Sequence, residues 1–157
     1  MTNNDDVIRV DKTPFDDVPV GQRRKTAKKW AKDQYRENNI FENDSTKQKI
    51  KITSGGIDHT VYEAYHPDAF YLLPVLPDII RQAKFVSTEA PIRDADGRNP
   101  EPDLHQVERY RTNVQLRGKP FEVELIVKVK KGKKGGDREL DSIGMYRNYY
   151  HHELHGK

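Results

Sequence analysis

One histidine, His59, follows a short cationic segment and a pair of glycines. Lys49 and Lys51 lie two apart in a run that alternates polar and apolar residues, which predicts a strand, and Gly55-Gly56 predicts a tight turn after it. This order places His59 and Thr60 just beyond the two lysines. An imidazole with an unperturbed pKa of about 6.5 can take or give a proton near neutrality, and ammonium groups stabilise a phosphate. The combination suits metal-independent cleavage of RNA. The alternative is that His59 only hydrogen-bonds a loop carbonyl while the basic residues are solvated.

Further cations come from two basic blocks. Residues 21–36 and residues 107–134 each carry a net charge of +6, whereas residues 1–20 carry −3, in a chain of net charge +3. Arg109 and Arg111 differ by two, so on a strand they point to the same face. The blocks favour a polyanionic partner such as RNA or another nucleic acid, because phosphate contacts dominate nucleic-acid affinity. The alternative is a solvated, lysine-rich surface.

Several other chemistries are excluded by their motifs. The run from His151 to His155 resembles a zinc-protease motif, but the residue after His151 is a second histidine and the glutamate is displaced to Glu153, so the motif fails. Gly55-Gly56 is followed by no Lys-Ser or Lys-Thr pair and is not a phosphate loop. The chain has no cysteine, which excludes a disulfide framework and thiolate zinc sites. We therefore expect neither a metal nor a cofactor.

The elements that must position these residues follow from periodicity. The 157 residues suit one domain, and 34% of them are hydrophobic, which predicts a small core. Residues 1–22 predict a flexible acidic arm. Apolar residues at i, i+3, i+4 and i+8, beginning at Ala27, predict a helix from residue 23 to about 38. Pro67 and Pro77 are each placed to start a short helix, which predicts a helical pair between residues 67 and 84.

The strongest strand pattern is the strict alternation of residues 121–129, which pairs with residues 107–116 through a turn at 117–120. Residues 87–104 predict a loop, and the tail from Leu140 predicts either a last strand or a short helix. We expect the hairpin to lie beside the strand of residues 49–53. The fold class is therefore α+β, with an N-terminal helix and a short helical pair packed on a curved antiparallel sheet of about four strands.

Several short stretches together resemble a known group of domains. The sequence is similar to the phage and mobile-element nuclease-fold domains of the barnase–EndoU–colicin–RelE group, above all to the modules of large polyvalent phage proteins. The stretches that carry this resemblance, which covers roughly residues 25–155, are Trp30-Ala31, Phe41 to Ser45, Ile50 to Thr53, Ile57 to Thr60, Leu76 to Lys84, the hairpin from Tyr110 to Val129, and Tyr149 to Leu154.

The resemblance implies one nuclease-fold domain over residues 23–157 that cleaves RNA without a metal. His59 falls at a family histidine and is expected to act as general base or acid. Arg111 would bind phosphate, and Tyr150 or His151 would be the second proton-transfer group, by extrapolation from their places on the sheet. The expected nucleic-acid contacts are Lys49, Lys51, Ser54, Thr60 and Arg109.

Two functions remain open at this point. One is a ribonuclease acting as a phage-encoded or polymorphic toxin in the cytoplasm of the bacterial host, delivered by a phage or held in a larger phage polyprotein, with an immunity protein as a further partner. The other is a catalytically silent module that binds nucleic acid or a capsid partner. A second titratable group opposite His59 would separate them, and only the tail offers one. No apolar run is long enough for a membrane span, so no membrane partner is expected.

Overall fold

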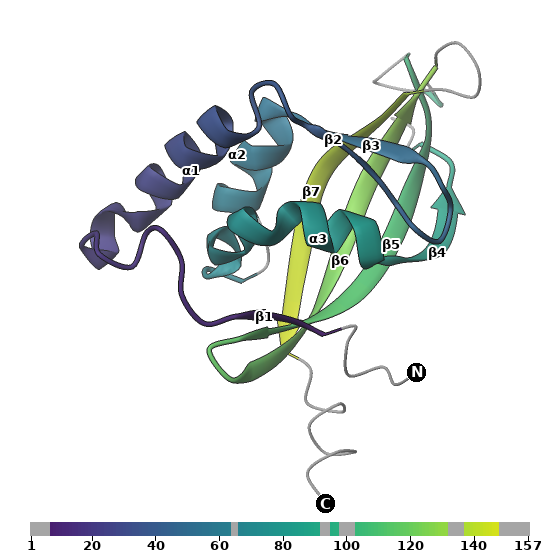
Figure 1. Cartoon of the computed structure of the whole chain (residues 1–157). Helices are drawn as coiled ribbons and strands as arrows, with labels where there is room; N and C mark the ends of the chain where they lie inside the picture. Colours follow the sequence, from purple (N-terminus) through teal and green to yellow (C-terminus); the bar gives the residue numbers. More distant parts are fainter. Residues whose placement is uncertain (1–6, 64–65, 92–94, 98–102, 132–136, 148–157) are drawn as a thin grey trace, which may run out of the picture.

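Seven strands form one strongly curled, mixed sheet (Figure 1). The computed structural model describes residues 7–63, 66–91, 95–97, 103–131 and 137–147. The sheet order is β1-β5-β6-β7-β3-β2, and β4 pairs with β5 beside β1. The strands are β1 (Ile8–Val10), β2 (Ile40–Glu42), β3 (Lys49–Ile52), β4 (Lys84–Glu89), β5 (Leu104–Leu116), β6 (Lys119–Lys130) and β7 (Asp137–Arg147).

The long antiparallel strands β5, β6 and β7 form the centre of the sheet. The β5–β6 hairpin closes through Arg117 and Gly118, which both have positive φ (50° and 82°), as a two-residue hairpin turn requires. One face of β6 is apolar throughout and buried, which confirms the hairpin that its alternation predicts. The α+β class is confirmed as well.

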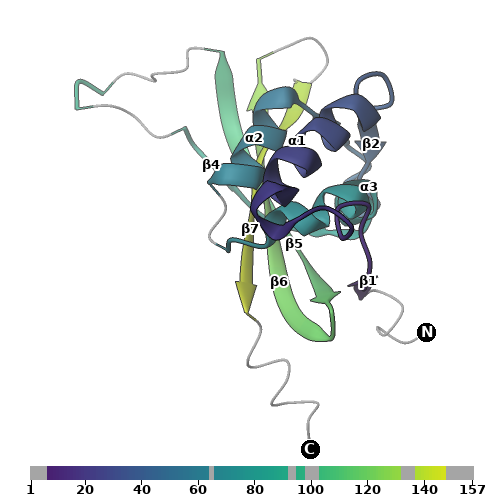
Figure 2. The same cartoon turned by 90° about the vertical axis from the view of Figure 1, so that its left-hand side faces the viewer.

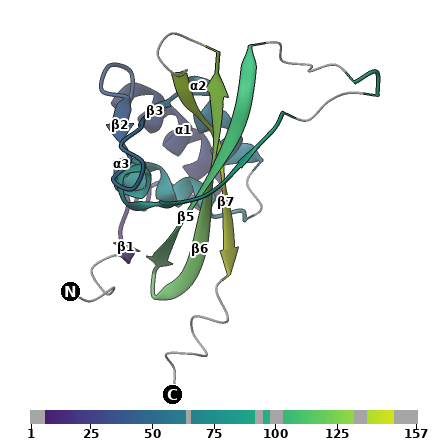
Figure 3. The ribbon, with the colours of Figure 1, turned by 90° about the vertical axis from the view of Figure 1, so that its right-hand side faces the viewer.

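The helices cover the concave face of this sheet (Figure 1). They are α1 (Arg23–Gln34), α2 (Ser54–Tyr62) and α3 (Leu76–Gln82), with short 3-10 turns η2 (Val20–Gln22) and η3 (Ala69–Val75). In the view of Figure 2, α1 lies outermost beside α2. The largest side chains of the core between helices and sheet include Phe15, Leu72, Leu76, Ile79, Tyr110, Leu125 and Ile143. The opposite face of β5–β7, which we call the outer face, carries no helix in the described part of the chain (Figure 3).

The sheet differs from the predicted one in size and direction. It has seven strands, and two of its pairs, β1–β5 and β3–β7, are parallel. The strand of residues 49–52 lies beside β7 and not beside the hairpin, because the closing strand β7 takes the free edge of β6. Residues 84–89, which span the predicted end of the helical pair at residue 84 and the start of the predicted loop at residue 87, form β4 on the edge of β5.

Two further predictions are wrong because tertiary contacts override local composition. Residues 1–22 are not an arm from residue 7 onward: Ile8–Val10 form β1, and the Phe15 side chain is fully buried. The glycine pair at 55–56 does not form a turn. It lies in the first turn of α2, where the Thr53 side chain caps the helix by accepting a hydrogen bond from the Gly56 N–H at 3.0 Å.

Candidate active site

Close packing of α2 on β7 places His59. A Cβ atom at Gly56 would overlap the carbonyl oxygen of Leu140, so only glycine lets the helix approach the strand this closely. The Thr53 hydroxyl donates to the same carbonyl at 3.4 Å and ties the start of α2 to β7. His59 lies three residues after Gly56, and its side chain therefore reaches the next residue of β7, Asp141.

The His59 ring is held by a backbone carbonyl. Its Nδ1 lies 2.9 Å from the carbonyl oxygen of Asp141, and because a carbonyl only accepts, Nδ1 carries the hydrogen of the neutral ring. The lone pair is then on Nε2, at the exposed end of a side chain that is 38% accessible. The carboxylate of Glu63, itself 67% exposed, lies 3.6 Å from Nε2. This is the arrangement in which a histidine can accept a proton from a substrate.

A bulge in β7 brings a cation to this histidine. Leu140 pairs with Val127 and Ser142 pairs with Ile126, so Asp141 between them has no opposite residue on β6. The carboxylate oxygen Oδ1 of Asp141 lies 3.4 Å from His59 Nδ1 and also 3.4 Å from the ammonium nitrogen of Lys128. The two nitrogens are therefore less than about 7 Å apart. We call His59, Glu63, Lys128 and Asp141 the His59 cluster.

Arg109 and Arg111 form a separate cluster on the outer face. Both contact the nearly buried carboxylate of Glu124, at 2.8 Å and 3.1 Å, and Arg109 also pairs with Glu89 at 2.7 Å. The hydrogen bond that Arg109 donates to Glu89, with the charge of Glu124, raises the pKa of Arg109 above its ordinary value, although burial acts the other way. The structure does not bring either arginine to His59. The cation that it brings there is Lys128.

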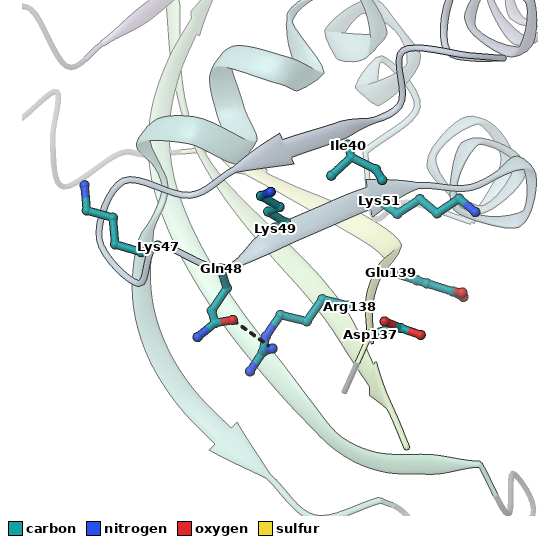
Figure 4. A pocket seen from close by; sticks show the side chains of 8 residues that line it. All are labelled: Ile40, Lys47, Gln48, Lys49, Lys51, Asp137, Arg138 and Glu139. Carbon is teal, nitrogen blue, oxygen red and sulfur yellow. Dashed lines mark hydrogen bonds between the residues drawn. The ribbon is translucent and has the colours of Figure 1, made fainter. Parts of the chain in front are cut away.

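Lys49 and Lys51 line a pocket of about 540 Å³ beside the β3–β7 pair (Figure 4). Both lysines are exposed, as their place on alternate positions of β3 predicts. Arg138 lies at the same pocket, and its guanidinium is fixed by two hydrogen bonds to the buried Glu108, at 2.8 Å and 3.0 Å, and by one to Gln48 at 3.1 Å. The full lining is Ile40, Lys47, Gln48, Lys49, Lys51, Asp137, Arg138 and Glu139.

The remaining predicted residues have different outcomes. Ser54 is exposed at the first position of α2, where its side chain is accessible. Thr60 is fully buried and its hydroxyl donates to the Gly56 carbonyl at 2.8 Å, so the nucleic-acid contact predicted for it is not compatible with this fold. Tyr150 and His151 lie outside the described residues.

Sequence reasoning missed the two partners of His59 on the sheet. Asp141 contacts His59, and Lys128 contacts Asp141, only because β7 bulges and α2 packs against it, and neither event has a local sequence signal. Within the described ranges, no three His, Asp or Glu side chains gather in a way that could hold a metal ion. No helix in those ranges has the length and apolar character that a bilayer span requires.

Comparison with known proteins identifies the family. The family model of large polyvalent protein-associated domain 3 matches residues 20–149. This range contains all three α-helices and every strand except β1. The chain belongs to this family, which links it to the large polyvalent proteins of phages. No curated protein and no solved structure matches the chain.

Proposed function

We propose that the domain is a metal-independent endoribonuclease whose proton-transfer group is His59. The observation that carries this proposal is the hydrogen bond from His59 Nδ1 to the Asp141 carbonyl, which leaves Nε2 as the proton acceptor at the surface. The Lys128 ammonium, which pairs with Asp141, lies less than about 7 Å from His59 Nδ1, and we assign it the role of the cation that binds the phosphate. The family's link to large polyvalent phage proteins supports a substrate in the cytoplasm of a bacterial host, and an immunity protein is a further partner of this proposal.

The reaction has two proton transfers. His59 Nε2 takes the proton of the ribose 2′-hydroxyl, and the 2′-oxygen attacks the adjacent phosphorus. The bond to the 5′-oxygen breaks, leaving a 2′,3′-cyclic phosphate, and the departing oxygen takes a proton. We assign that second proton to Tyr150 or His151. The Lys128 ammonium offsets the charge that grows on the phosphate oxygens.

The test is cleavage of labelled RNA in excess EDTA. His59→Ala should lower the rate by about 10²- to 10⁴-fold, the usual contribution of a general acid or base. Lys128→Ala should lower it less. His105→Ala is the control, because His105 is an exposed histidine at the start of β5, a strand that contributes no residue to the His59 cluster. Equal cleavage by His59→Ala and His105→Ala would show that His59 is not the catalytic group.

One observation favours a second function, a catalytically silent binding module. Arg111, which was predicted to bind phosphate beside His59, pairs instead with Glu124 on the outer face, so the predicted catalytic residues are not all brought together. This alternative predicts that the wild-type protein binds RNA in EDTA and releases no 2′,3′-cyclic phosphate ends. Mass spectrometry of the RNA termini separates the two functions.

A further inference from the structure

A basic stripe runs along the outermost helix, away from the sheet. Its four members recur at i, i+3, i+4 and i+7 of α1, which places them within roughly 100° of arc on one side of the helix. They are Lys25, Lys28, Lys29 and Lys32, and we call them the lysine stripe. Lys25 and Lys29 are exposed and have no ion pair among the described residues.

The stripe borders the exposed side of α2, where His59 lies. Lys28 and Lys32 reach across to Asp58, at 3.5 Å and 2.9 Å. Burial acts to raise the pKa of Asp58, but the hydrogen bond and charge of Lys32, together with the charge of Lys28, outweigh it and hold the pKa below its ordinary value. One carboxylate thus faces two lysines, and the stripe keeps an excess of positive charge.

An exposed aromatic ring lies at this junction. The Tyr62 side chain is 55% accessible, and the ammonium of Lys28 lies 5.2 Å from the centre of its ring. Tyr62 is three residues after His59 on the same helix, so the two side chains are surface neighbours. A large exposed ring among cations is the pattern of a base-stacking platform, since every base offers a π-face and its phosphates need positive charge.

We propose that Tyr62 and the lysine stripe bind single-stranded RNA, with one base stacked on Tyr62 and the neighbouring phosphates on the lysines. This rests on the proposed function, because it places the bound strand next to His59. A single strand fits better than a duplex, whose stacked bases cannot reach an aromatic side chain. An acidic peptide would satisfy the lysines but leave the ring unused.

The experiment measures binding without cleavage. A fluorescent 2′-O-methyl RNA 12-mer has no free 2′-hydroxyl to attack its phosphates, so the full chain can be titrated in EDTA and followed by anisotropy. Tyr62→Ala should weaken binding by roughly 5- to 100-fold, the fold-change of one lost base stack, whereas Tyr62→Phe should bind like wild type. Lys25→Glu/Lys29→Glu should weaken binding. The slope of the log binding constant against log salt should become shallower by at least about 1.4, the contribution of two phosphate contacts. The control for one charge reversal is Lys119→Glu, at an exposed lysine of the β5–β6 turn.

The outcomes decide this inference separately from the cleavage reaction. If Tyr62→Ala binds the 12-mer within twofold of wild type, the stacking platform is wrong, even where His59-dependent cleavage is found. If Tyr62→Ala weakens binding of the single strand alone and wild type does not cleave RNA, the proposed binding surface is supported and the proposed ribonuclease activity is contradicted. Equal loss on a duplex of the same length, or on a polyglutamate peptide, would overturn the assignment to a single strand. Unchanged circular dichroism of each variant shows that it is folded.

Discussion

Asn43 joins two parts of the fold through one side chain. Its Nδ2 donates to the carbonyls of Ile80 and Ala83, at 2.8 Å and 2.6 Å, and so closes the end of α3. Its Oδ1 accepts from the backbone N–H groups of Ser45 and Thr46, both at 3.0 Å, and so shapes the β2–β3 loop. The residue is fully buried. The sequence shows only an Asn in a polar run, and nothing local reveals that two of its partners, the carbonyls of Ile80 and Ala83, lie about forty residues away.

Replacing the Asn43 side chain should therefore lower the free energy of unfolding far more than replacing an exposed asparagine. Asn43→Ala leaves buried donors and acceptors without partners and should lower the free energy of unfolding by about 2–4 kcal/mol. Asn38→Ala, at an exposed position, should change it by less than about 0.5 kcal/mol. Urea unfolding followed by circular dichroism measures both. A loss at Asn43 no larger than that at Asn38 would contradict the joining role.

Tyr110 predicts how the fold responds to alkali. Burial, together with the nearby Glu108 carboxylate, raises the pKa of Tyr110 from 10.0 to about 12. The folded-state pKa lies above the unfolded one, so the stabilisation is complete below pH 10 and is lost as the pH rises through about 12. Tyr110→Phe has no such titration. At pH 8 it should be less stable than wild type by about 1 kcal/mol, because Glu108 loses the hydrogen bond that the phenol donates at 3.0 Å.

The difference in unfolding free energy between wild type and Tyr110→Phe should narrow above pH 10 and reverse by about pH 11. The measurement is the urea midpoint of wild type and Tyr110→Phe at pH 8, 10 and 11.5. The comparison isolates Tyr110 from Tyr35, whose pKa burial also raises and which both proteins retain. A difference that stays constant across this range would show that Tyr110 is not buried as described.

At the scale of elements, α2 offers a matched pair of glycines. Gly56 has no room for a Cβ against Leu140, while a Cβ at its neighbour Gly55 would meet nothing within 4 Å. Gly56→Ala should push α2 away from β7, lower stability by about 1–3 kcal/mol and lower any His59-dependent cleavage, because Asp141 then no longer holds the ring. Gly55→Ala should raise stability by about 0.5–1 kcal/mol, since alanine favours the helix. Thermal unfolding and the RNA assay test both variants; equal effects would contradict the close packing.

The same helix shows where prediction from sequence stops. The β5–β6 hairpin and α1 are predictable because a long period-2 or period-3.6 pattern is a direct consequence of one buried face. Gly55-Gly56 favours a turn by local rules, but packing on β7 and the Thr53 cap make it helix. β4 has no such pattern because nearly all of its residues are exposed. The contact of His59 with Asp141 could not be predicted either, because it depends on the bulge in β7 and on the parallel β3–β7 pair, and neither has a local pattern.

At the scale of the whole molecule, the core extends beyond the part that defines the family. The family model begins at residue 20, yet β1 pairs with the end of β5, and Phe15 is buried with its ring against Trp30 at a centroid distance of 5.7 Å. Arg117 at the β5–β6 turn donates to the carboxylate of Asp16. That segment reads as polar by composition, because its few apolar residues are widely spaced. Its contacts nevertheless link the N-terminal segment, the first helix and the hairpin.

Removing the Phe15 ring should therefore destabilise the whole domain and not only its edge. Phe15→Ala deletes a fully buried ring and should lower the free energy of unfolding by about 3–5 kcal/mol. The matched control is Val20→Ala, because the Val20 side chain is 74% exposed and should contribute less than about 0.5 kcal/mol. If the domain unfolds as one unit, denaturant melts of Phe15→Ala followed by Trp30 fluorescence and by far-UV circular dichroism should shift together. A shift in the Trp30 signal alone would mean that the N-terminal segment and α1 unfold separately from the sheet.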